Sequence, residues 1–289
     1  MAHDQFIELI DRETVLAECG PMRLTIRAWQ GRRAQQQLCR HAAAEAFGFL
    51  QRVAKWRKTL SQPAGNIRTI PEDILALQMI HSVKTVGDPD LTPMAAVAGA
   101  IADAVADWIF ERGGSRVIVD NGGDIAVRLA KEETVNVGVR PSIRAPNMSH
   151  LLVLDSQRSS WGVTTSGFGG RSFTRGIASA VTALAASAAV ADAASTAIAN
   201  ACFVQDENIR QIPAERIDPN TDLAGCPVTV HIGKLSAAKR KAAQINALQR
   251  AEDLVARGII VGALICQNKR FAMTSSLNTW IHKISDTRY

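Results

Sequence analysis

The chain has 289 residues, of which 47% are hydrophobic and 21% charged, a composition typical of a globular protein with one large or two small domains. The mean hydropathy of +0.01 predicts a sizeable core, and no apolar run looks long enough to predict a membrane span. The formal net charge is +6, but aromatic residues make up only 5%, so we expect a small anionic ligand and no nucleic acid.

The N-terminus and the cysteines favour a cytoplasmic protein without a membrane partner. Residues 1–16 carry acids where a signal peptide has a basic stretch followed by an apolar one. The cysteines form no Cys-x-x-Cys pair, which is typical of free thiols in a reducing compartment and argues against structural zinc. They are Cys19, Cys39, Cys202, Cys226 and Cys266.

The N-terminal portion, residues 1–90, predicts strands followed by helices. A Gly-Pro pair marks the turn between the strands, and two prolines and a glycine mark a loop between the helices. The expected elements are two strands within 5–28, a helix over 32–58, a loop over 60–71 and a short helix over 72–84.

A long helix then begins at Thr92-Pro93 and opens the remainder of the chain, residues 91–289. Threonine can cap a helix, and proline fits its first position. Apolar residues recur at spacings of three and four until Gly113-Gly114 ends the helix. Small residues dominate its first half, so we expect another element to pack very close there.

The rest of the chain predicts strands and two further helical stretches. From composition alone, the alanine-rich tract 177–201 is helical. Because the strands pair mostly as hairpins and the helices are few and long, the pattern favours an α+β fold with antiparallel sheets. The expected elements are strands at 116–119, 125–129 and 134–141, a hairpin over 150–167, a strand at 227–233, a helix over 236–257, and a closing hairpin that turns at Asn268.

The first candidate site is the stretch Asp-Asn-Gly-Gly-Asp between two of these strands. Two glycines let the backbone approach a ligand, and successive N–H groups in such a turn can bind an anion. A hairpin turn with solvated acids explains the stretch equally well. The residues are Asp120, Asn121, Gly122, Gly123 and Asp124.

The second candidate is the pair Asp192 and Thr196, which are four residues apart and share a helix face with Asn200. A carboxylate and a hydroxyl are hard oxygen ligands of the kind that bind Mg²⁺. The alternative is structural: Asp192 favours the helix dipole near the helix start, and Thr196 bonds back to the preceding turn.

The third candidate is the glycine-rich stretch 164–172, in which hydroxyls and an arginine could cradle a pyrophosphate. It is neither a P-loop nor a nucleophile elbow, because the Gly-Lys-Ser/Thr and Gly-x-Ser-x-Gly patterns are absent. An ordinary glycine-rich hairpin end is the alternative. The candidate residues are Thr165, Ser166, Gly167 and Arg171.

Taken in order, the stretches VDNGGDI, VGVRP, GVTTSGFGG and ADAASTAIANA resemble the ApbE-like superfamily. Its best-known members are FAD-dependent protein flavinyltransferases, and LTPMAAVAGAIADAV and IDPNTDLAG are more similar to an uncharacterised cytoplasmic branch. The resemblance covers nearly the whole chain. It implies one T-fold-like α+β domain over 1–289, and a strand at 180–185 in place of an unbroken helix.

The resemblance also assigns the candidate residues. It implies that Asp192 and Thr196 match the Mg²⁺-binding positions, that 121–124 match the turn beside the flavin, and that 165–167 match the loop that follows. FAD or FMN and Mg²⁺ are therefore the expected cofactors. A homodimer is expected from the small faces of the alanine-rich helices.

Two departures from the family bear on the reaction. The flavinyltransferases carry a catalytic histidine motif after Thr-Ser-Gly, where this chain has FGGRSFTRGIAS without a histidine. In the uncharacterised branch a cation and an acid stand where this chain has Ile177 and Ser179. Three hypotheses stay open: a protein that binds a flavin or a similar anionic ligand, a Mg²⁺-dependent FAD:protein FMN transferase, and a small-molecule degradation enzyme that works without flavin. The sequence does not decide whether the protein is an enzyme.

Overall fold

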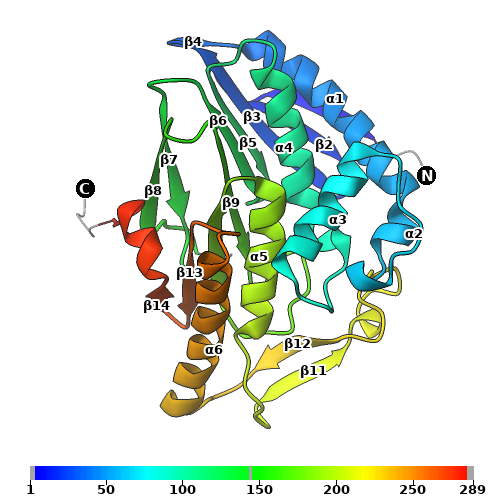
Figure 1. Ribbon diagram of the computed structural model, residues 1–289, viewed down its shortest axis with the longest axis vertical. Helices are drawn as coiled ribbons and strands as arrows, with labels where there is room; N and C mark the ends of the chain where they lie inside the picture. Colours follow the sequence, from blue (N-terminus) through cyan, green and yellow to red (C-terminus); the bar gives the residue numbers. More distant parts are fainter. Residues whose placement is uncertain (1–3, 143–144, 285–289) are drawn as a thin grey trace. The chain divides into compact units, whose positions relative to one another are not determined.

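The computed structural model describes residues 4–142 and 145–284, and Figure 1 draws its helices and strands. The chain divides into two compact units that are interleaved in sequence. The division does not follow the boundary near residue 90, and the single-domain organisation stays a prediction. Unit 1 comprises Met1–Val135, Asp155–Thr164 and Ala185–Ala193, and unit 2 comprises Asn136–Leu154, Thr165–Leu184 and Ala194–Tyr289.

Unit 1 is built on an antiparallel sheet whose strands follow the order β1-β2-β3-β5-β6-β9. Along β3 buried and exposed residues alternate, as expected for a strand with one face on the core. The strands are β1 (Gln5–Leu9), β2 (Val15–Cys19), β3 (Met22–Gln30), β5 (Arg116–Asn121), β6 (Ile125–Leu129) and β9 (Ser160–Ser166), and the short β4 (Arg33–Ala34) pairs with β3.

Helices α1 and α4 of unit 1 pack against this sheet, and α3 packs against both of them. The helix expected at Thr92-Pro93 begins with a 3₁₀ turn, η2 (Pro93–Ala96), and Thr92 makes no side-chain capping bond to it. The α-helix proper starts at Val97. The helices are α1 (Gln36–Lys55), α2 (Arg57–Leu60), η1 (Ala64–Asn66), α3 (Ile74–Val86) and α4 (Val97–Phe110).

One helical run is long and apolar enough to cross a membrane by length and composition, so the sequence prediction that none reaches that length is wrong. Among the described residues this run is Pro93–Phe110, with a mean hydropathy of 1.4. It is 56% buried, and α4 packs on β5 and β6. The core helix of a globular unit has these same properties.

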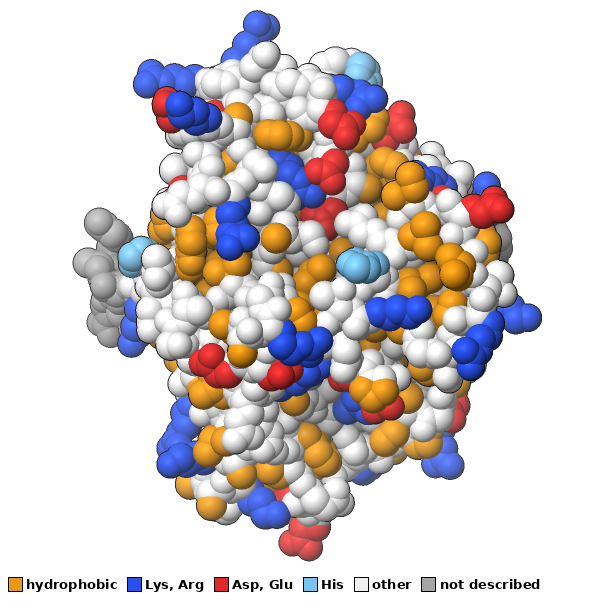
Figure 2. Space-filling view, viewed as in Figure 1, with side chains coloured by type: hydrophobic (Ala, Val, Ile, Leu, Met, Phe, Trp, Pro, Cys, Tyr) orange, Lys and Arg blue, Asp and Glu red, His pale blue; other side chains and the backbone are white. Residues whose placement is uncertain are grey.

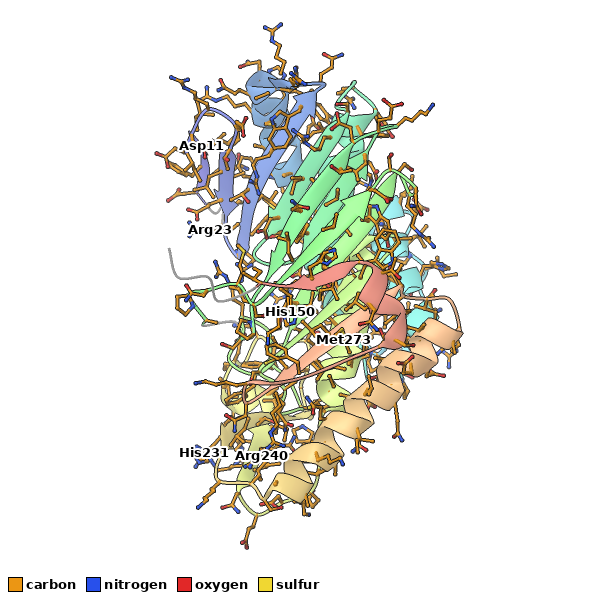
Figure 3. The ribbon with its side chains drawn as sticks, turned by 90° about the vertical axis from the view of Figure 1, so that its left-hand side faces the viewer. Asp11, Arg23, His150, His231, Arg240 and Met273 are labelled. Atoms are coloured by element: carbon orange, nitrogen blue, oxygen red, sulfur yellow. The ribbon has the colours of Figure 1, made fainter. Side chains whose placement is uncertain are left out.

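Unit 2 contains three groups of antiparallel strands and the long helix α6 (Ala237–Ala256), which packs on β13. Figure 3 shows Arg240 on α6, His231 on β12, and His150 and Met273 on β8 and β14. The groups are β10 (Ala180–Ala185) with β13 (Gly262–Gln267) and β14 (Arg270–Met273), β15 (Ile281–Lys283) with β8 (His150–Asp155) and β7 (Thr134–Val139), and β11 (Ile209–Pro213) with β12 (Pro227–Ile232). Two 3₁₀ turns, η3 (Ala214–Arg216) and η4 (Ser275–Thr279), complete it.

Most of the expected elements of the second half are confirmed. The tract 177–201 splits into β10 and α5 (Ala188–Ala201), because tertiary pairing with β13 overrides the helix propensity of alanine. Helix α6 is capped by Ser236, whose hydroxyl accepts a hydrogen bond from the Lys239 N–H. The hairpin expected over 150–167 is wrong, because β8 pairs with β15 and β7 while β9 pairs with β6.

Candidate functional site

The Asp-Asn-Gly-Gly-Asp stretch is the two-residue turn of the β5–β6 hairpin in unit 1. Gly122 and Gly123 have φ angles of 69° and 109°, and the Asn121 N–H donates to the Asp124 carbonyl at 3.0 Å. Positive φ at both central residues is what a type I′ turn requires, so hairpin geometry alone accounts for both glycines. The Gly123 N–H already donates to the Asp120 carboxylate at 2.6 Å.

The side chain of Asn121 ties this turn to the start of α4. Its Nδ2 donates to the Ala98 carbonyl at 3.1 Å, and the residue is 4% exposed. A buried amide in this position holds the turn and the helix end in a fixed relation, because losing the bond would leave polar groups buried without partners.

Asp192, from the chain segment after β10, meets the same helix end. Its Oδ2 accepts the Gly99 N–H at 3.0 Å, and the Ala98 N–H also donates to this carboxylate. Helix α4 has no side-chain cap of its own at Ala96, so Asp192 caps it from a distance of 93 residues in the chain. The start of α4 therefore joins the glycine turn to Asp192 within unit 1.

The capping is reciprocal, because Asp103 of α4 caps the start of α5. Its carboxylate accepts the N–H groups of Ala188 and Ala189 at 3.1 and 2.9 Å. The two helix starts touch at Gly99, where a Cβ atom would lie 2.2 Å from the Ala188 carbonyl oxygen. The close packing expected from the small residues of this helix is thus present.

Arg128 of β6 completes the charged network beneath these helix starts. Its guanidinium contacts the fully buried Asp103 at 3.0 Å, and the half-exposed Asp107 through two bonds of 2.5 and 3.0 Å. Burial lowers the pKa of Arg128, but the Asp107 and Asp103 carboxylates outweigh it and raise that pKa above its ordinary value. Arg128 therefore stays charged.

Asp192 has a protonation equilibrium near neutrality. Burial raises the pKa of its carboxyl to about 7, and the negative charge of Asp103 also raises it. The N–H groups of Gly99 and Ala98 lower this pKa, but by less than burial raises it. The residue as a whole is half-buried. Asp192 is thus a proton-binding group at a helix start.

In unit 2, the predicted residues of the third motif lie at and beyond the end of β9. The Thr165 and Thr182 hydroxyls lie 2.8 Å apart and share a hydrogen bond. Gly167 has a φ of 154°, and a Cβ there would lie 3.0 Å from the Ser179 carbonyl oxygen. Ser166 is half-buried and Arg171 is exposed.

A hydrogen-bonded clamp follows this glycine-rich stretch, and no sequence pattern indicated it. The Asn200 Oδ1 accepts the Thr174 hydroxyl at 3.2 Å and the Arg175 N–H at 2.9 Å. The Gln211 side chain and the Thr229 hydroxyl both donate to the Arg175 carbonyl, at 2.7 and 2.9 Å. The sequence placed Asn200 on one helix face with Asp192 and Thr196. In the structure, its side chain holds the backbone at Arg175.

A hollow in unit 2 next to the β11–β12 hairpin is lined by none of the predicted site residues. Glu207, Asn208, Arg210 and His231 line it, and His231 is visible in Figure 3. Within the described residues, the glycine turn and Asp192 belong to unit 1, whereas Thr165, Ser166, Gly167, Arg171 and Thr196 belong to unit 2.

A family model described as AbpE bacteria matches residues 8–273, which is most of the chain. The chain belongs to this family. It is thus ApbE-like, as the order of its motifs predicted.

Solved structures share the fold over nearly their full length. An ApbE protein from Thermotoga maritima has a TM-score of 0.53 at 12% identity, covering 96% of this chain and 99% of its own. The apo form of the flavinyl transferase ApbE from Pseudomonas stutzeri has a TM-score of 0.51 at 13% identity, covering 96% and 97%. At such identities the likeness establishes the α+β fold alone.

Curated relatives are more similar in sequence but over shorter stretches. A UPF0280 protein from Methanoregula boonei is 36% identical over 107 residues, which is 36% of this chain and 44% of the relative. A UPF0280 protein from Archaeoglobus fulgidus is 36% identical over 111 residues, which is 37% and 42%. The match thus spans less than half the length of these relatives.

In this ApbE-like chain the predicted Mg²⁺ ligand Asp192 already takes part in hydrogen bonds, and its role in metal binding stays a prediction. Its carboxylate accepts two backbone N–H groups, and the neighbouring acid, Asp103, is bound to Arg128 and two further N–H groups. No group of three His, Cys, Asp or Glu residues in 4–142 and 145–284 is arranged to hold a metal ion. Thr196 lies one helical turn further along α5.

The two positions that depart from the uncharacterised branch have structural roles here. Ile177 is buried, and its N–H donates to the Cys202 carbonyl at 2.8 Å. The Ser179 hydroxyl accepts the Asn268 N–H at 3.1 Å. An apolar residue and a neutral hydroxyl therefore serve packing and a turn at positions where the branch carries charges.

Proposed function

We propose that this ApbE-like protein binds a flavin, FAD or FMN, or a similar anionic nucleotide-like ligand at the glycine turn of unit 1. The observation that carries the proposal is the hydrogen-bonded connection in unit 1 between the glycine turn, the start of α4 and Asp192. Residues from three distant parts of the chain are held there in one arrangement. Such convergence of polar groups is typical of a binding site.

The fold and the charge support the proposal. The chain shares its fold with a protein described as a flavinyl transferase. The net charge of +6 suits a phosphate-bearing ligand. The ring or ribose of such a ligand can donate hydrogen bonds to carboxylates such as Asp120 and Asp124.

The experiment is to record the absorbance spectrum and mass of any co-purifying small molecule, and then to titrate the protein with FAD and FMN. The variant Asp124→Asn should weaken binding about tenfold, because a charge-assisted contact contributes about 1–3 kcal/mol. Asp155→Asn, a half-buried acid of β8, is the matched control. A colourless protein without affinity for either flavin would reject the proposal and favour a degradation enzyme that works without flavin.

A second candidate, a Mg²⁺-dependent FAD:protein FMN transferase, is favoured by the fold shared with the flavinyl transferase ApbE and by the Asp192–Thr196 spacing. The absent histidine motif and the donor set around Asp192 weigh against it. Incubation with FAD, Mg²⁺ and a peptide containing serine and threonine separates the candidates. Covalent FMN on the peptide, detected by mass spectrometry, would favour the transferase over simple binding.

A further inference from the structure

Arg128 and Asp103 form a charged pair in the interior of unit 1. Figure 2 shows Lys, Arg, Asp and Glu side chains scattered over the molecular surface, where charged groups are ordinarily found. Arg128, by contrast, is 5% exposed, Asp103 is fully buried, and the two groups lie 3.0 Å apart. A buried ion pair is often no more stabilising than well-packed apolar residues of similar volume. Its contribution to stability alone therefore does not account for the pair, and the elements that it joins become the important feature.

The β5–β6 hairpin contacts helix α4 at two points. Next to the glycine turn, the Asn121 amide donates to the Ala98 carbonyl at 3.1 Å. At the other end of β6, the Arg128 guanidinium donates to Asp103 and Asp107, which lie further along α4. Two separated contacts fix both the position and the direction of the helix relative to the glycine turn.

Helix α4 in turn contacts the start of α5 at two points. The Asp103 carboxylate accepts the N–H groups of Ala188 and Ala189, at 3.1 and 2.9 Å. The Gly99 N–H donates to the Asp192 carboxylate at 3.0 Å. The side chain that Arg128 holds is therefore the same one that holds the first residues of the helix carrying Asp192.

The start of α5 has no free space on either side. A Cβ atom at Gly99 of α4 would lie 2.2 Å from the Ala188 carbonyl oxygen, and one at Gly162 of β9 would lie 2.3 Å from the Ala188 nitrogen. The Ser160 hydroxyl of β9 also donates to the Ala186 carbonyl at 2.6 Å. Because backbones packed this closely leave no gap, α5 can shift only if α4 or β9 shifts with it.

We propose that Arg128 is a positioning residue of the ligand site in unit 1. By holding Asp103, it fixes the start of α5 and keeps Asp192 against the start of α4, beside the glycine turn. This role rests on the proposed function, in which a flavin or a similar anionic ligand binds at that turn. Arg128 acts through Asp103 and not on the ligand, because it is buried.

The guanidinium group is what suits an arginine to this task. Its Nε donates to Asp107, its Nη1 to the Val127 carbonyl, and its Nη2 to both Asp103 and Asp107. A lysine keeps the positive charge but has a single nitrogen, so it cannot make this set of bonds. A methionine keeps much of the length and removes the charge.

The first test measures the affinity of the full chain for FAD and FMN in Arg128→Met and Arg128→Lys. Arg128→Met should raise the dissociation constant about tenfold, as for other residues that act on a site without touching its ligand, and Arg128→Lys should raise it less. Leu60→Ala is the control for lost stability, since this fully buried leucine of α2 takes no part in the network, and it should leave the affinity unchanged. Parental affinity in both Arg128 variants, or an equal loss in Leu60→Ala, overturns the proposal. A parent chain that binds neither flavin rejects the proposed function instead.

The second test needs no ligand, so it decides the role of Arg128 whether or not a flavin binds. Amide hydrogen exchange of the parent and of both Arg128 variants is followed residue by residue by NMR. Exchange should be faster at Gly99, whose N–H donates to Asp192, as well as at Ala188 and Ala189, whose N–H groups donate to Asp103. A purely local role would accelerate exchange at the two alanines alone. A Gly99 amide that exchanges at the parental rate in both variants, or that is accelerated equally by Leu60→Ala, overturns the proposal.

Discussion

The two compact units hold their candidate residues by different means. Unit 1 fixes Asp192 and the glycine turn with charges: two buried or half-buried carboxylates cap helix starts, and Arg128 neutralises the buried Asp103. Unit 2 fixes the end of its glycine-rich stretch with neutral groups, the side chains of Asn200, Gln211 and Thr229 around Arg175. The stability of unit 1 should therefore depend on pH and on paired charges, and that of unit 2 on single neutral hydrogen bonds.

Removing the buried acid of unit 1 should have the largest effect. Asp103→Ala leaves the N–H groups of Ala188 and Ala189 without their acceptor and removes the buried partner of Arg128. We expect the free energy of unfolding to fall by about 3–5 kcal/mol, as is usual when one partner of a buried ion pair is removed. Urea unfolding at neutral pH measures it.

Asp107→Ala is the matched control, because this acid contacts the same guanidinium but its side chain is 52% exposed. It should cost less than Asp103→Ala, because the lost carboxylate is half solvated and Asp103 still pairs with Arg128. Equal losses for the two variants would show that the network is not organised around the buried Asp103.

The corresponding change in unit 2 should be smaller. Asn200→Ala removes the acceptor of the Thr174 hydroxyl and the Arg175 N–H, which costs about 1–3 kcal/mol for neutral donors left without a partner. Because the groups are neutral, the loss measured by urea unfolding should be the same at pH 5 and pH 7.5. Asn246→Ala, which removes an exposed bond to the Phe203 carbonyl, is the control. A loss that changes with pH would contradict the neutral clamp.

The sequence predicted the α+β class because it depends on local signals: strand alternation, glycine turns, and the Ser236 cap of α6. It also placed Asp192 on a helix close to its start. The split of tract 177–201 came from family resemblance, since alanine propensity alone favours one helix. Local signals fail where pairing is non-local, which is why β8 was paired with the wrong strand and β11 and β15 were not anticipated.

The roles of individual polar residues were the least predictable. Asp103 accepts a hydrogen bond from the Ala188 N–H, and Asn200 accepts one from the Arg175 N–H. Both partners are distant in sequence, and no spacing pattern in the sequence predicts such contacts. The two glycines of the Asp-Asn-Gly-Gly-Asp stretch suggested a ligand, yet the turn itself requires them. A glycine motif therefore predicts the backbone conformation of a turn more reliably than it predicts ligand binding.

The smallest predicted change in stability is that of Asp192→Asn. It tests most directly whether the stability of unit 1, unlike that of unit 2, depends on pH. The pKa of Asp192 is about 7 in the folded chain and near 3.8 when unfolded, so between about pH 4 and pH 7 the folded state holds a proton that the unfolded state has lost. Raising the pH through this window thus destabilises the parent. Asp192→Asn keeps an acceptor for the Gly99 N–H but does not ionise. From pH 5 to pH 7.5 its stability should rise relative to the parent by about 1–2 kcal/mol, less than the full linkage value because the residue as a whole is half-buried. Urea unfolding at pH 5, 6 and 7.5 measures the difference, and a constant difference would show that Asp192 does not titrate in this range.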